Sequence, residues 1–196
     1  PQDVERMFFI HGESVQSIRG REIRKKPKPV KPYHPTELPP EILKLVKNVN
    51  LAIDIFFVQK RPYLHTISKD IKMRTADYLP TMTKGNLKNS LNKVLRLYKD
   101  FNVTKIDADN QFECIRDEFL PIVMDICAAG EHVPAAERSI RVVEEYARVL
   151  TQGLPYRRYP RAPVNGIITK AISSLNSFPS KNGISDDISP RTIVTQ

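Results

Sequence analysis

The feature that most constrains the fold is a run from Leu51 to Val58, in which a single acid, Asp54, interrupts an otherwise apolar stretch. An apolar run of this length, rich in β-branched and aromatic residues, predicts a strand of the core. Burying an unpaired carboxylate inside such a strand would cost on the order of several kcal/mol. Asp54 is therefore expected to face a solvent cleft, a metal ion or a charged partner.

The apolar patterning of the whole chain predicts an alternation of strands and helices. Three strands come first and form an antiparallel meander, and they fall at residues 50–58, 63–68 and 73–79. A helix with a basic face follows, and then come a strand at 103–106, a short helix at 112–119, a strand at 122–127 and helices that begin at Pro134 and Ala162. This is the ribonuclease H-like order, so we predict an α/β fold with a mixed five-stranded sheet flanked by helices.

Two further carboxylates stand at the ends of predicted elements. Asp109 follows the apolar run 101–106, which places it at the exit of a strand. Glu137 lies in the first turn of a helix, because Pro134 suits a first helical position, where a missing N–H costs nothing. Asp107 competes with Asp109 for the first of these positions, since strand alternation puts both side chains on one face.

These acids suit metal-assisted phosphodiester chemistry. Such a reaction needs an activated oxygen nucleophile and relief of charge on the leaving oxygen, which two divalent ions roughly 3.5–4 Å apart can supply. Hard oxygen ligands favour Mg²⁺ or Mn²⁺. We predict that Asp54 bridges both ions and that Asp109 and Glu137 each hold one. A structural explanation of Glu137 also exists, because it would favour the helix dipole and pair with Arg141.

The charge of the chain indicates an anionic partner. Net charge is +9 and the isoelectric point is near 9.6, while no apolar run approaches the length of a membrane span. Nucleic acid is therefore the expected partner, and we expect no membrane partner. Prolines between residues 27 and 40 exclude helix, so residues 1–40 are predicted to form an extended basic arm. The arm is either a strap along DNA phosphates or a solvated linker.

The candidate contacts to nucleic acid are basic residues of this arm, of the Glu137 helix and of the segment Tyr156–Tyr159. That segment interleaves aromatic and charged side chains, which suits phosphate or base contact, although an ordinary helix connector explains it too. The candidates are Arg24, Lys25, Lys26, Lys28, Lys31, Arg138, Arg141, Arg157 and Arg158.

The two cysteines, Cys114 and Cys127, form neither a disulfide framework nor a zinc pattern. A reducing compartment, cytosol or nucleus, is the expectation. The first residue is a proline and no signal peptide is visible, so we expect the chain to be a fragment of a longer one.

At its acids the sequence resembles the catalytic core of retroelement integrases, most closely those of copia-like retrotransposons. The family carries an Asp-Asn pair after a core strand, here Asp109-Asn110, and an Ala-Glu-Arg-X-X-Arg helix start, here residues 136–141. Asp54 stands where the family has its first aspartate, in the middle of a strand. The resemblance covers roughly residues 49–195.

The resemblance implies an enzyme, a polynucleotidyl transferase that trims element DNA ends and joins them to target DNA through a two-metal carboxylate site. It further implies a homo-oligomer that binds both DNAs in the nucleus or in a cytoplasmic element particle. In this interpretation residues 1–40 are the arm, 41–179 the catalytic core and 180–196 a polar connector tail.

Two departures from the family pattern keep other functions open. Gln111-Phe112-Glu113 stands where the family has paired glycines before Glu-Phe, and the interval between Asp109 and Glu137 is shorter than usual. The ligands of the zinc module that precedes copia-like cores are also absent. A catalytically inactive, element-derived nucleic-acid-binding domain is therefore one alternative, and a ribonuclease H-like nuclease is the other.

Overall fold

The computed structural model describes residues 46–128, 133–152 and 158–195, together with residues 6, 9, 42, 44, 131 and 154. The chain divides into Pro1–Pro35 and Thr36–Gln196, and the description below concerns the second of these units. The predicted arm residues Arg24, Lys25, Lys26, Lys28 and Lys31 lie outside the described residues, as does Arg157.

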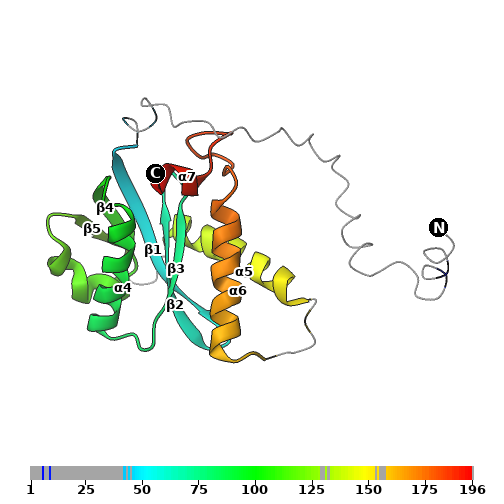
Figure 1. The fold of residues 1–196 in the computed structure, drawn as a ribbon. Helices are drawn as coiled ribbons and strands as arrows, with labels where there is room; N and C mark the ends of the chain where they lie inside the picture. Colours follow the sequence, from blue (N-terminus) through cyan, green and yellow to red (C-terminus); the bar gives the residue numbers. More distant parts are fainter. Residues whose placement is uncertain are drawn as a thin grey trace. The chain divides into compact units, whose positions relative to one another are not determined.

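Five described strands form one mixed sheet in the order β3-β2-β1-β4-β5 (Figure 1). The strands are β1 Asn48–Val58, β2 Arg61–Ser68, β3 Arg74–Tyr78, β4 Asn102–Ala108 and β5 Val123–Ile126. β2 is antiparallel to both β1 and β3, whereas β4 is parallel to both β1 and β5. The apolar run that contains Asp54 thus forms the central strand, and the predicted five-stranded sheet is confirmed.

Helices cover both faces of this sheet. They are α4 Lys84–Leu97, the 3₁₀ helix η1 Asn110–Phe119, α5 Pro134–Gln152, α6 Arg161–Asn176 and α7 Pro190–Val194. On one face, Leu51 and Ile53 of β1 share a core cluster with Leu91 of α4. On the other face, Phe56 packs with Val143 of α5 and Ile168 of α6. Side chains of β1 therefore pack against helices on both faces of the sheet, because successive side chains of a strand point to opposite faces.

Residues 180–196 differ from the predicted polar tail. Ser189 caps the short helix α7 by accepting a hydrogen bond from the backbone N–H of Thr192 at 3.1 Å. Ile188, Ile193 and Val194 of this segment are buried in the same cluster as α4, and Ile184 is partly buried against it. Few apolar side chains among many polar ones dock the segment, which is why composition alone suggested a tail.

His65 joins β2 to α5 inside the protein. Its ring is 0% exposed, and Nε2 lies 2.8 Å from the hydroxyl oxygen of Ser139 in α5. The same oxygen accepts a hydrogen bond from Nε of Arg74 in β3 at 3.1 Å. Burial, and then the positive charge of Arg74, lower the pKa of His65 to about 3, although the Thr75 backbone opposes this. The imidazole is therefore neutral at neutral pH, which suits a structural residue.

We expect this buried histidine to make the fold acid-sensitive. Between the ordinary pKa near 6.5 and the folded pKa of about 3, the unfolded chain binds a proton that the folded chain does not. The free energy of unfolding should therefore fall by about 2 kcal/mol between about pH 7 and about pH 5. Urea unfolding across this range measures the effect, and His65→Gln should remove most of the slope. A parent protein of constant stability over this range would contradict the expectation.

Candidate active site

Asp54 lies on the face of the sheet that α5 covers. It is flanked by Ala52, which shares a cluster with Ala136 of α5, and by Phe56, which packs with Val143 further along that helix. Because side chains two residues apart on a strand point to the same face, Asp54 does so too. Its carboxylate accepts a hydrogen bond from the backbone N–H of Ile55 at 2.6 Å. The acid that interrupts the apolar run is thus held rigidly in the central strand.

The register between β1 and β4 brings Asp109 beside Asp54. The parallel pairing of these strands runs as far as Ala52 opposite Asp107. Asp54 and Asp109 each lie two residues beyond that pair, so continuing the register sets them side by side on one face. Asp109 keeps extended backbone angles and caps η1, with its carboxylate accepting from the N–H of Asn110 at 2.6 Å. Asp109, just beyond the end of β4, is therefore expected at the level of Asp54 in the middle of β1.

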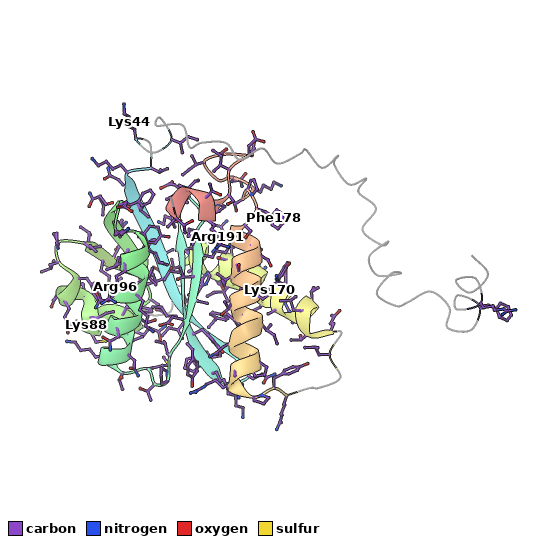
Figure 2. The ribbon with its side chains drawn as sticks, viewed as in Figure 1. Lys44, Lys88, Arg96, Lys170, Phe178 and Arg191 are labelled. Atoms are coloured by element: carbon purple, nitrogen blue, oxygen red, sulfur yellow. The ribbon has the colours of Figure 1, made fainter. Side chains whose placement is uncertain are left out.

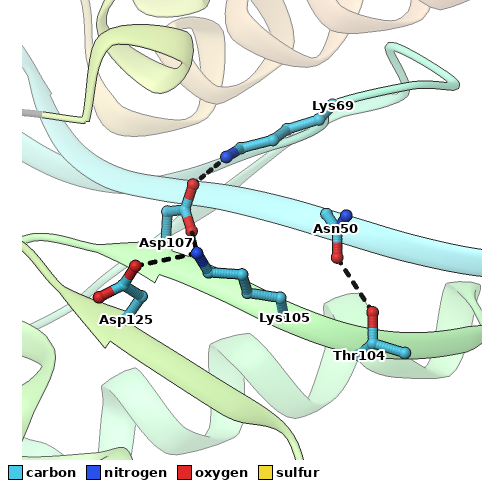
Figure 3. Close-up of polar contacts among 6 residues, drawn as sticks. All are labelled: Asn50, Lys69, Thr104, Lys105, Asp107 and Asp125. Carbon is cyan, nitrogen blue, oxygen red and sulfur yellow. Dashed lines mark hydrogen bonds and ion pairs between the residues drawn. The ribbon is translucent and has the colours of Figure 1, made fainter.

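Asp107 and Asp109, which compete in the sequence, have different surroundings, and Figure 3 shows those of Asp107. Asp107 is paired with Lys69 and with Lys105, whose Nζ lies 3.3 Å away, and its side chain is only 15% exposed. Lys105 also reaches Asp125 at 2.9 Å, and hydrogen bonds to Asp125 and then to Asp107 raise the pKa of Lys105. Asp109 makes no ion pair with any described residue. The structure thus favours Asp109 as the acid available to a ligand.

Glu137 occupies the first turn of α5 with an exposed side chain. Within the described residues it makes no ion pair, so the pairing with Arg141 that would explain it structurally is not seen. No three His, Cys, Asp or Glu side chains gather closely enough to share a metal ion in the part of the chain that the structure describes. The strand register thus suggests that Asp54 and Asp109 are neighbours, whereas nothing in the described residues groups Glu137 with them.

The carboxylates of Asp54, Asp109 and Glu137 have the donor chemistry that a divalent ion needs. The strand register further suggests that Asp54 and Asp109 are close enough to share an ion. Carboxylate oxygens are the hard ligands that Mg²⁺ and Mn²⁺ prefer. Asp54 and Asp109 are both partly exposed, so solvent and ions can reach them. They are the residues that would hold an ion here, with Glu137 of α5 as the third candidate.

Three of the candidate nucleic-acid contacts lie among the described residues, and all three are at the surface. Arg138 and Arg141 are exposed on α5, and Arg158 is exposed before α6. Sequence reasoning missed a second basic group, which lines a cavity of about 780 Å³ at the start of α5. Three of its members, Lys69, Lys72 and Arg74, stand close together in the sequence, and that spacing was the available signal.

Comparison with known proteins identifies the fold. No protein-family model and no curated protein matches the chain. Among solved structures, the catalytic core domain of BIV integrase is 19% identical, with 74% of this chain and 92% of that one covered and a TM-score of 0.53. The HTLV-2 integrase catalytic core domain in complex with magnesium, in a trimeric form, is 13% identical, with 76% and 98% covered and a TM-score of 0.55.

A dimeric form of the HTLV-2 core is also similar, at 12% identity, 77% and 98% coverage and a TM-score of 0.55. At these identities the likeness concerns the fold. The chain therefore has the ribonuclease H-like fold of integrase catalytic cores, as the order of its elements predicts. Within the described residues, no helix combines the length and apolar character needed to cross a membrane.

Proposed function

We propose that this chain is the catalytic core of a copia-like retrotransposon integrase, which trims element DNA ends and joins them to target DNA. The observation that supports the proposal is the parallel register of β1 and β4 as far as Ala52 and Asp107, from which we infer that Asp54 and Asp109 are neighbours in a fold shared with integrase cores. The Ala136–Arg141 motif at the start of α5 supports the copia-like assignment.

In this proposal each acid has a separate position and role. Asp54 pairs with His65 of β2 within the central strand, which fixes its backbone, so it is the acid that would hold both ions. Asp109, at the strand exit, and Glu137, on α5, would each hold one ion. Two divalent ions bound there supply an activated oxygen nucleophile and neutralise charge on the leaving oxygen. The HTLV-2 core was solved in complex with magnesium, which supports Mg²⁺ or Mn²⁺ as the cofactor.

DNA is the proposed partner, both as element ends and as target. Net charge of +9 and the exposed arginines 138, 141 and 158 favour binding to a phosphate backbone. A homo-oligomer is proposed as well, since the similar HTLV-2 cores were solved as a trimeric and a dimeric form. We further propose that residues 1–40 form a basic arm, that the core begins at residue 41, and that the protein acts in the nucleus or in an element particle. The predicted connector at 180–196 packs on this core through α7.

A DNA-joining assay tests the proposed integrase activity. With Mn²⁺, the full chain should join a short duplex that carries a recessed end to a second duplex, and chelation of the metal should stop the reaction. Cleavage of an RNA–DNA hybrid without any joining would instead identify a ribonuclease H-like nuclease. DNA binding with neither reaction would identify the inactive domain, a second candidate that the position of Glu137 favours, because this acid is not grouped with Asp54 and Asp109.

A further inference from the structure

A cavity of about 780 Å³ opens where the β2–β3 turn, the first turn of α5 and the segment after α6 meet. Among the residues that the structure describes, five basic side chains and one acid line it, and together they carry a formal charge of +4. We call these six residues the basic pocket, and they are Lys69, Lys72, Arg74, Arg138, Lys181 and Asp107. Three separate parts of the chain therefore contribute positive charge to one hollow.

The single acid cannot neutralise the basic pocket. Asp107 is already engaged by Lys69 and by Lys105, which does not line the cavity. Within the described residues, none of the other four basic side chains makes an ion pair. Like charges gathered in a partly desolvated hollow repel one another, so an anion bound among them would relieve that repulsion.

Arg74 is the best-positioned ligand of the basic pocket. Its Nε donates to the Ser139 hydroxyl at 3.1 Å, and one terminal nitrogen donates to the backbone carbonyl of Lys72 at 3.2 Å. Both acceptors are neutral, and burial lowers the pKa of Arg74, so the charge is held where solvation is poor. A guanidinium oriented by neutral groups keeps its charge available for a ligand.

The start of α5 adds a second source of positive potential. Pro134 and Ala135 both line the cavity, so the N-terminal end of this helix of 19 residues faces it. The first N–H groups of a helix have no partner within the helix, and the helix dipole makes this end attractive to anions. Phosphate groups bind at helix N-termini for these reasons.

We infer that the basic pocket binds a phosphate group. Arg74 offers the planar fork that matches phosphate oxygens, while Lys72, Lys181 and Arg138 add charge around the cavity. The phosphate belongs either to the backbone of a nucleic-acid strand or to free phosphate, and the chemistry of recognition is the same. None of Asp54, Asp109 and Glu137 lines the cavity, so this binding requires no metal ion.

Two double variants of equal charge test the inference. Arg138→Gln with Lys181→Gln alters the basic pocket, and Arg96→Gln with Lys170→Gln is the matched control. All four side chains are exposed, so neither variant should unfold the protein. Figure 2 shows Arg96 on α4 and Lys170 on α6, and neither lines the cavity. Both variants are compared with the full chain in buffer that contains a chelator, so that no joining can occur.

Two probes separate the sources of phosphate. Inorganic phosphate should raise the thermal midpoint of the parent and of the control, and the pocket variant should lose this rise. A short DNA duplex followed by fluorescence anisotropy should bind the pocket variant about tenfold more weakly, with a shallower salt dependence, and the control less than about twofold more weakly. A selective loss for the duplex assigns the phosphate to a nucleic-acid strand, and a loss for inorganic phosphate alone assigns it to free phosphate. Equal behaviour of the two variants with both probes would overturn the inference.

Discussion

Asp54→Asn is expected to abolish metal-dependent joining of DNA ends and to leave the fold intact. The amide has nearly the shape of the carboxylate, so the packing of Ala52 and Phe56 on either side should persist. It lacks the negative charge that would hold two ions. We expect the rate to fall by at least about a thousandfold, equivalent to about 4 kcal/mol of transition-state stabilisation.

A matched variant controls for the loss of one negative charge. Asp100→Asn changes an acid whose side chain is 63% exposed in the turn between α4 and β4. It should join DNA at nearly the parental rate. If Asp54→Asn joins DNA as fast as Asp100→Asn, the carboxylate of Asp54 has no catalytic role.

Ile193→Ala is expected to destabilise the protein by about 2–5 kcal/mol, the usual cost of truncating a buried isoleucine. Ile193 is only 2% exposed in α7 and belongs to the cluster that contains the inner face of α4. The expected destabilisation has two causes, since the variant buries less apolar surface and leaves a cavity in a core that cannot fully collapse. Urea unfolding of the parent and the variant measures the difference.

Arg191→Ala provides the comparison within the same helix, because its side chain is exposed (Figure 2). It should change the free energy of unfolding by less than about 0.5 kcal/mol. A loss for Ile193→Ala that is no larger would return residues 180–196 to the polar connector that composition predicts.

The central strand β1 could be predicted because residues 51–58 are apolar except for Asp54. The Asp54 run indicated a core strand, and Pro134 marked the first residue of α5, which the structure confirms. α7 could not be predicted in the same way. Its buried residues are Pro190, Ile193 and Val194, and a helix of five residues is too short to give a periodic pattern.

The sequence proposes the residues of the candidate site but not their geometry. The sequence shows that Asp54 interrupts one apolar run and that Asp109 follows another, but their expected adjacency depends on the parallel register of β1 and β4, whose partners are far apart in the chain. The position of Glu137 depends on how α5 docks on the sheet. The basic pocket was missed for a related reason, since Lys69 and Lys181 meet only in the folded chain.

Anomalous diffraction from crystals of the full chain soaked in Mn²⁺ tests the central claim most directly. The account predicts manganese bound by the carboxylates of both Asp54 and Asp109, with Glu137 completing the site. The same soak of Asp54→Asn crystals should show no ion there. Manganese bound elsewhere, with none in contact with Asp54 or Asp109 of the parent, would contradict the account and leave only the shared fold.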